Sequence, residues 1–337
     1  MRINTGWNGG STIASTRRVH QVLPFGIASA FLPCFTPLMT NPTKPLAPFD
    51  YSQPPGASAL LGPGSVAWRV YKNRIALAIG GVSAVLMEFA DPRIRSGVWD
   101  HSTYRLDPIG RSERTGYAAM IGVYGPQDAA RRVIAGVGRM HARVGGKTPG
   151  GIAYQATDPE LLDWVSATAG YGFLTAYHRF VSPVSSADQA RFFREGEAVA
   201  ALYGVQNKLS CLADFDAMME RLAPGFEPHP INLEFLEIIQ SGKAAPTVPR
   251  FLHRALARAA VSILPPLIRK RLELGREFDL SLTDRIAVKL VARMAERKHD
   301  PASPPAQASV RLGLPSNFLY RGAADRARLL ESLGLAA

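Results

Sequence analysis

The sequence predicts an all-α protein with a single large helical domain, and three observations lead to this fold class. Alanine, leucine and arginine are abundant and runs of β-branched residues are short, which favours helices over strands. Apolar residues recur at spacings of three and four in several segments, the period of a helix face. Hydrophobic residues make up 47% of the 337, enough for a large buried core, and no internal repeat is visible. We therefore expect one domain of packed helices.

The N-terminal residues 1–64 differ from the rest and predict an extended or disordered segment. Residues 1–38 place a basic pair before an apolar stretch, which is the outline of an export signal. Pro24 and Pro33 interrupt that stretch, and no clean cleavage site follows it. We therefore interpret residues 1–38 as a disordered extension or an upstream mis-start, with a signal as the alternative. Residues 40–64 predict an extended segment on the domain surface.

The main domain is expected at residues 65–297, and its first strong helical region is residues 65–92, in which the apolar stretch from Ile75 to Ala90 predicts a buried core helix. The stretch covers 16 residues, fewer than the ~20 that span a bilayer, so no transmembrane span is expected. Gly80 and Gly81 lie inside it, and glycine there lets another helix or a flat ligand approach the backbone closely. Asp91–Pro92 is expected to end this helix, with a loop after it.

Two more helices are expected on either side of Gly125–Pro126. The first covers residues 110–124, and the second covers residues 129–144 with Asp128 as its candidate N-cap. In the second helix, apolar residues and one histidine fall at spacings of three and four: Ala130, Val133, Val137, His141 and Val144. Because His141 belongs to this stripe and Arg139 does not, we expect the histidine to point inward.

The remainder of the chain also favours helices. Residues 145–157 are glycine-rich and predict turns or a short hairpin; a phosphate loop is excluded because Lys147–Thr148 comes too early. Asp158–Pro159 combines a cap with a first-turn proline and starts a helix that reaches residue 180. Further helices are expected at residues 186–203, 214–222, 232–239, 248–263, 266–274 and 282–296. Residues 298–337 predict a proline-rich tail with a short C-terminal helix.

Charge and cysteine content limit the partners. The formal net charge is +12, but the basic residues are scattered, without zinc-finger spacing, an aromatic RNA-binding signature or a polybasic arm. We therefore expect a solvated basic surface and no nucleic acid. Cys34 and Cys211 form no disulfide framework and no metal set, which fits a reducing compartment. The expected location is cytoplasmic, or exported if residues 1–38 act as a signal; the oligomeric state is left open.

The common catalytic signatures are missing from the sequence. It contains no Gly-x-Ser-x-Gly elbow, no His-Glu-x-x-His zinc helix and no dinucleotide fingerprint, and its seven histidines form no paired set. What remains is the inward His141, with Arg111 and Thr115 four residues apart and hence on one helix face. Haem needs one neutral imidazole, apolar helix faces and cations for its propionates. A buried structural histidine explains the same residues, so both interpretations stay open at this point.

Three stretches of the sequence resemble the rubber oxygenase (latex-clearing protein) family, which includes the endoplasmic-reticulum-bound oxygenase of mycophenolic acid synthesis. They are Arg-x-x-x-Thr at Arg111 and Thr115, His-Ala-x-Val-x-Gly at His141 to Gly146, and Tyr-x-Ala-x-Asp-Pro-Glu-Leu-Leu-x-Trp-Val at Tyr154 to Val165. The likeness covers roughly residues 65–290. Together the three motifs are specific for the family, although none of them is so alone.

The resemblance implies globin-like core helices around a haem pocket, and a haem b-dependent oxygenase that uses dioxygen on an apolar, isoprenoid-type substrate. His141 is then the iron ligand. Arg111 and Thr115 line the haem pocket and supply positive charge or a hydrogen bond during the reaction. Arg114 is expected near the distal side or a propionate.

The sequence departs from the family pattern at two places. Many relatives carry a histidine after Trp-Val, where this chain has Ser166; His178 could substitute, although a satisfied structural histidine also fits. No carboxylate upstream of Arg111 aligns with the proposed base of the rubber-cleaving members. Glu88 is a candidate, at the end of an apolar helix where a buried ion pair or surface exposure is equally compatible. The alternative function is therefore a non-catalytic haem- or lipid-binding protein, a carrier or sensor.

Overall fold

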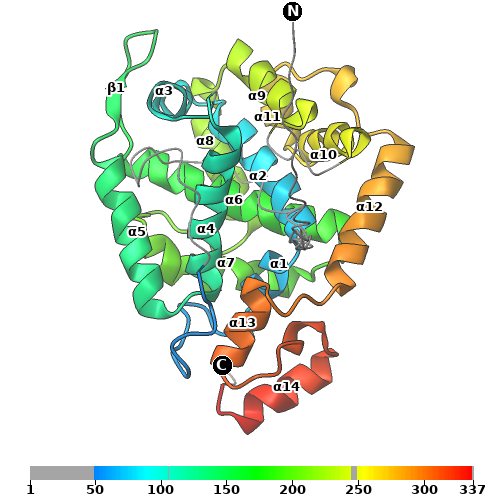
Figure 1. The fold of residues 1–337 in the computed structure, drawn as a ribbon. Helices are drawn as coiled ribbons and strands as arrows, with labels where there is room; N and C mark the ends of the chain where they lie inside the picture. The colour runs from blue at the N-terminus through cyan, green and yellow to red at the C-terminus, as the bar shows by residue number, and fades with distance from the viewer. Residues whose placement is uncertain (1–48, 105, 244–248, 336–337) are drawn as a thin grey trace, which may run out of the picture.

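The all-α prediction is confirmed by the computed structural model, which describes residues 49–104, 106–243 and 249–335. These residues form fourteen α-helices, three short 3₁₀ turns and one two-stranded sheet (Figure 1). The expectations for residues 1–38, and for the first part of the segment 40–64, lie outside the described residues.

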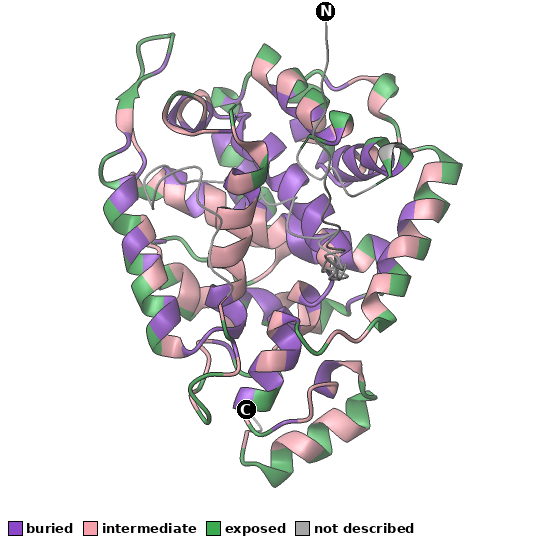
Figure 2. Cartoon of the chain, viewed as in Figure 1, coloured by how far each residue is buried: buried purple, intermediate pink, exposed green. Residues whose placement is uncertain are grey.

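The centre of the fold is the crossing of α2 (Arg74–Glu88) and α6 (Pro159–Phe180). Every residue of α2 after Arg74 is buried, as the predicted core helix requires, and the helix is purple along its length in Figure 2. Gly80 of α2 meets Gly172 of α6 so closely that an added Cβ at Gly80 would lie 2.6 Å from the carbonyl oxygen of Gly172. The close helix approach predicted for this glycine pair is therefore confirmed at Gly80.

Two helix boundaries near α2 differ from the prediction. α1 (Val66–Tyr71) is separate from α2, because the Asn73 side chain accepts a hydrogen bond from the Ala76 N–H at 3.0 Å and starts a new helix. Asp91 likewise accepts from the Arg93 N–H at 2.8 Å and caps α3 (Pro92–His101). The loop expected after Asp91–Pro92 thus contains a helix, because Asp-Pro is a start signal as well as a stop.

The segment from α4 to α6 follows the prediction closely. α4 (Pro108–Tyr124) and α5 (Gln127–His141) flank Gly125–Pro126. Pro126 occupies the N-cap position of α5, so the assignment of Asp128 as the cap is wrong and Asp128 lies in the first turn. The glycine-rich stretch forms an antiparallel hairpin of β1 (Gly145–Lys147) and β2 (Ala153–Gln155), with Gly146 opposite Tyr154.

The helices predicted from residue 186 to residue 296 are all present, with ends that differ by a few residues. They are α7 (Ser186–Leu202), α8 (Leu212–Leu222), α9 (Pro230–Ser241), α10 (Arg250–Ser262), α11 (Pro266–Arg271) and α12 (Leu282–Arg297). The 3₁₀ turns are Ala223–Gly225, Arg276–Phe278 and Phe318–Tyr320.

The C-terminal region packs more tightly than a proline-rich tail would. Besides the predicted closing helix, α14 (Ala323–Ser332), it contains α13 (Pro304–Arg311), which begins with a first-turn proline. Arg311 is buried, and its guanidinium donates hydrogen bonds to the carbonyl oxygens of Tyr51, Ala57 and Tyr124. The tail therefore ties the segment before α1 to the end of α4.

Among the described residues, no single helix has both the length and the hydropathy needed to cross a membrane. α2 and α3 meet these two criteria only when taken together, across a bend of 113°.

Candidate functional site

A cavity of about 300 Å³ lies between α2, α4, α5, α6 and α7, at the lower end of the range for small-molecule sites. Much of its wall consists of glycine and alanine: Gly81, Ala84, Ala118, Ala119, Gly122, Ala167, Ala169, Gly170, Gly196 and Ala200. Tyr71, Phe173, Phe192 and Phe193 add aromatic surface. The site is thus mainly apolar, as expected for a cavity that binds an apolar ligand.

Small side chains on facing helices create this space. A Cβ added at Gly122 of α4 or at Gly196 of α7 would meet no atom within 4 Å, although both residues line the cavity. No neighbouring backbone comes close enough at these two positions to replace the missing side chains. The cavity is therefore a consequence of residue size at a few positions.

His141 is the last residue of α5, and its side chain lines the cavity. The prediction that it points inward is confirmed, because the residue is only 7% exposed while Arg139 is exposed. Burial, and secondarily the positive charge of Arg111, lower the pKa of His141 to about 4. At neutral pH the imidazole is therefore uncharged, which is the form that binds metals.

Arg111 and Thr115 lie one turn apart on α4. Thr115 lines the cavity, and its hydroxyl donates a hydrogen bond to the Arg111 carbonyl oxygen at 3.2 Å. The Arg111 side chain is fully buried and its charge acts on His141, but it is not among the residues that line the cavity, contrary to the expectation for it. Of the four residues of the predicted site, His141 and Thr115 therefore line the cavity, and Arg111 is near enough for its charge to act on His141.

Arg114 has a different environment from its neighbours on α4. Its guanidinium donates a hydrogen bond to Thr103 Oγ1 at 3.0 Å and forms an ion pair with Asp107 at 3.5 Å. Asp107 is also the N-cap of α4, where it accepts from the Gly110 N–H at 2.8 Å. Arg114 therefore braces the start of α4, and it is not among the residues that line the cavity.

Glu88 places a carboxylate in the cavity wall. The residue is 1% exposed, which excludes the surface position considered for it, and its Oε1 accepts a hydrogen bond from the Thr168 hydroxyl at 3.2 Å. Thr168 comes from α6, so the pair forms where the C-terminal end of α2 passes that helix. A buried carboxylate beside an apolar cavity is a candidate for holding or accepting a proton.

Ser166 lines the same cavity as His141, so the departure from the family pattern lies inside the site. Asp163, one turn earlier on α6, was not singled out from the sequence. It is buried and accepts hydrogen bonds from the backbone N–H groups of Gln206 (2.7 Å) and Asn207 (3.1 Å). Asp163 thereby fixes the segment after α7, which brings Lys208 to the cavity. The spacing of Asp163, Ser166 and Gly170 on one helix face was the available signal.

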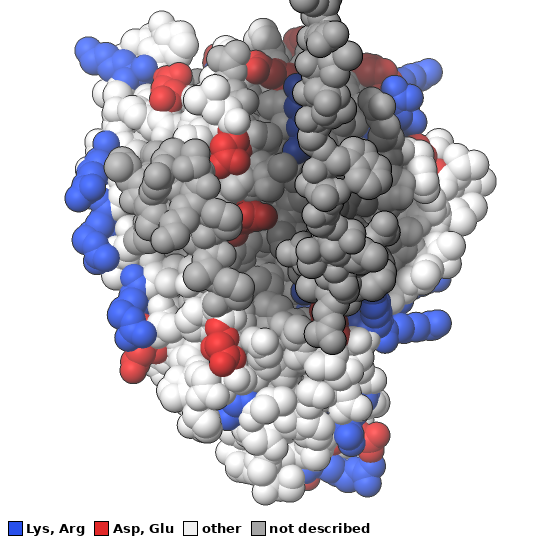
Figure 3. Space-filling model, viewed as in Figure 1, with Lys and Arg blue, Asp and Glu red and all other residues white. Residues whose placement is uncertain are grey.

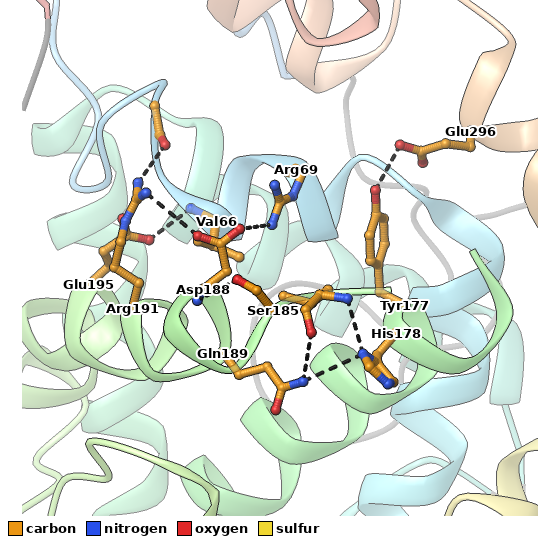
Figure 4. A network of polar contacts seen from close by, with 12 residues as sticks. Val66, Arg69, Tyr177, His178, Ser185, Asp188, Gln189, Arg191, Glu195 and Glu296 are labelled. Carbon is orange, nitrogen blue, oxygen red and sulfur yellow. Dashed lines mark hydrogen bonds and ion pairs between the residues drawn. The ribbon is translucent and has the colours of Figure 1, made fainter. Parts of the chain in front are cut away.

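His178 does not take the place of the histidine that relatives carry at position 166. Figure 4 shows His178 in a polar network between α6 and α7, where its Nδ1 accepts from the Val184 N–H at 3.0 Å and lies 3.4 Å from Gln189 Nε2. It does not line the cavity. The interpretation of His178 as a satisfied structural histidine is therefore confirmed.

The same network attaches the cavity wall of α7 to α1. Asp188 forms an ion pair with Arg69 at 2.7 Å, and Glu195 Oε2 accepts from the Val66 N–H at 2.8 Å (Figure 4). These contacts hold in place the part of α7 that carries Phe192, Phe193 and Gly196. The network is thus a support for the site and contributes no group to the cavity chemistry described above.

The chain matches a family described as "ER-bound oxygenase mpaB/B'/Rubber oxygenase, catalytic domain" over residues 68–297. This match begins inside α1, ends with α12 and covers the three stretches quoted from the sequence. Comparisons with curated proteins and with solved structures gave no match.

Proposed function

Since this chain belongs to the family of mpaB-type and rubber oxygenase catalytic domains, we propose that it is a haem b-dependent oxygenase that acts with dioxygen on an apolar substrate. The observation that carries this proposal is the uncharged imidazole of His141 in the wall of a mainly apolar cavity.

The residues around the cavity fit a haem. Within the described part of the chain, no three His, Cys, Asp or Glu side chains gather to hold a metal ion by themselves. Haem requires only one protein ligand, and His141 would supply it. The glycine and alanine wall would admit a flat ring, and Lys208 in that wall together with the buried Arg111 would supply cations for the propionates. When bound, haem supplies the binding and activation of dioxygen.

The chain's own residues then set the electrostatics of the reaction. Arg111 is a buried, permanent positive charge, and such a charge stabilises negative charge that develops in a water-excluded site. The Thr115 hydroxyl lies in the cavity wall and can reorient to donate a hydrogen bond there. Both groups come from successive turns of α4, which packs against α5, the helix that carries His141.

The apolar wall and Glu88 set the substrate and the proton transfer. Aromatic and aliphatic lining binds an apolar molecule and keeps water away from the reacting atoms. Glu88 is the last residue of α2, and its carboxylate lines the cavity and accepts a hydrogen bond from Thr168. It is a group of the wall that could hold a proton during the reaction.

The test of the cofactor is a spectrum of the full chain purified from haem-supplied cells, in the oxidised and the dithionite-reduced states. We expect the Soret band of a haem protein, with one iron per chain. His141→Ala should lose both the band and the iron. His178→Ala is the matched control, because that histidine lies at the end of the same helical core without lining the cavity, and it should keep both.

A colourless, iron-free wild-type protein with an intact helical circular-dichroism spectrum would overturn the haem proposal. Oxygen uptake with isoprenoid substrates separates the two functional classes. A red protein that consumes no oxygen with any of them would favour the carrier or sensor over the oxygenase.

A further inference from the structure

α12 exposes an apolar stripe along its outer face. Leu282, Ile286, Leu290 and Met294 are spaced four residues apart, and each is between 58% and 71% exposed. The opposite face of the helix packs on the core through Val288 and Ala292, which are fully buried. α12 therefore carries apolar side chains on two faces, and only the inner face packs against the rest of the protein.

No other helix of the described residues carries more than one large exposed apolar side chain. The remaining ones lie singly on separate elements, such as Ile152 on the hairpin and Val310 on α13. Single exposed apolar residues are normal on soluble proteins, whereas a row of four marks an interaction surface. Figure 3 shows the outer edge over the upper part of α12 as an uncharged surface.

The charges of α12 are sorted by face. Its two acidic residues turn inward: Asp284 pairs with Arg258 at 3.1 Å, and Glu296 pairs with Lys72 at 2.8 Å. From Leu282 to Lys298 the exposed charged residues are all basic: Arg285, Arg293, Arg297 and Lys298. The exposed acidic residues Glu277 and Asp279 precede the helix, and Asp279 is paired with Arg269. The outer face of α12 thus offers apolar side chains interspersed with positive charge.

We propose that α12 docks on an anionic lipid surface, lying in the plane of the headgroups. Helices that combine an apolar stripe with arginine and lysine bind at this interface, because the apolar side chains enter the acyl boundary while the cations meet anionic headgroups. A second copy of the chain is a poorer partner. A symmetric dimer through this face would bring the arginines of two α12 helices together.

Docking through α12 involves none of the residues that line the cavity, so it is independent of the proposed oxygenase function. Docking would also hold the protein at the lipid bilayer, in which apolar molecules dissolve. The net charge of +12 adds a general attraction to anionic membranes, and the stripe makes that attraction specific for one face.

The experiment is co-sedimentation of the full chain with vesicles of phosphatidylcholine, with or without about 30% phosphatidylserine. We expect strong binding to the anionic vesicles, weakened by salt, and weak binding to the neutral ones. Ile286→Asn/Leu290→Asn should reduce binding to anionic vesicles by about tenfold or more. Ile152→Asn/Val310→Asn, which removes two exposed apolar side chains elsewhere, is the matched control and should bind as the wild type does.

Equal binding of the α12 variant and the wild type to anionic vesicles would overturn the proposal, because another surface would then carry the attraction. Absence of wild-type binding would overturn it as well. A wild-type dimer that the α12 variant converts to monomer, measured by light scattering, would assign the stripe to a contact between copies instead. Since all four positions are exposed, melting temperatures near the wild-type value should verify that each variant folds.

Discussion

Two neighbouring glycines of α2 lie in differently packed regions: Gly80 in the close contact with α6, and Gly81 in the cavity wall. At Gly80 the backbones of α2 and α6 touch at Gly172, and no space is left. At Gly81, one residue later, the helix faces the cavity. A small residue therefore has no fixed meaning in a helix. At Gly80 the facing helix also has a glycine, and the two backbones come into contact. At Gly81 the helix borders the cavity instead.

The two regions also differ in what they contribute to stability. Close backbone contact at the crossing adds dispersion contacts between α2 and α6. The cavity lacks such contacts at Gly122 and Gly196, where nothing lies within 4 Å of an added Cβ. A packed interior loses stability with each void, so a cavity of this size is a structural cost that a ligand offsets when it binds.

The largest expected effect is at the crossing. Gly80→Ala would place its methyl group 2.6 Å from the Gly172 carbonyl oxygen, against backbone that cannot rotate away. Overpacking costs about 1–3 kcal/mol where side chains can adjust. We expect about 3 kcal/mol or more here, since two helix backbones must separate. The melting temperature should fall by roughly 6–12 °C in a calorimetric scan.

Gly172→Ala tests the same contact from the other helix and should destabilise the protein to a similar degree. The double variant should cost less than the sum of the two, because once the helices have separated both methyl groups gain room. Two single variants with wild-type melting temperatures would mean that the helices do not touch at this point in solution.

The second prediction concerns pH, which should affect the cavity region and leave the crossing unaffected. The pKa of His141 is about 4 in the folded protein and 6.5 in an unfolded chain. Above pH 6.5 the imidazole is neutral in both states and contributes no difference. As the pH falls towards 4, the unfolded chain takes up the proton first, so the free energy of unfolding decreases. The full loss is on the order of 3 kcal/mol, complete below about pH 4.

The measurement is urea denaturation of the haem-free protein at several pH values in this window, compared with His141→Gln. Other titrating groups are common to both proteins, so the difference between the two stability curves isolates the histidine. The wild type should lose stability relative to the variant as the pH falls. Parallel curves would mean that the imidazole is hydrated, and the cavity wall would then be open at that point.

The comparison also shows what the sequence can and cannot reveal. The inward direction of His141 was predictable because the apolar stripe of α5 is a local pattern. The environment of Glu88 was not, because it depends on Thr168, 80 residues away on α6. α3 was missed because Asp91–Pro92 was interpreted only as the end of a helix, although the same dipeptide caps the next one.

The different surroundings of Gly80 and Gly81 could not be predicted from the sequence for the same reason. Gly80 and Gly81 are identical in their local pattern, and only the facing helices distinguish them. The tail gave a related error: only a closing helix was predicted in it, whereas Pro304 lies in the first turn of a further helix, α13.

The smallest expected effect has the opposite sign to the first. Gly196 lies well inside α7, lines the cavity and would meet nothing within 4 Å if it carried a Cβ. Gly196→Ala should therefore stabilise the haem-free protein by up to about 1 kcal/mol, because alanine restricts the unfolded chain and favours the helix. The melting temperature should rise by roughly 2–4 °C.

The same methyl group should reduce the extra stability that added haem confers, because it enters the space that the ligand needs. The two measurements together distinguish an open cavity from a collapsed one. If Gly196→Ala lowered the stability of the haem-free protein, as Gly80→Ala should, the helices around the cavity would have to close on each other in solution, and the two kinds of glycine would be alike after all.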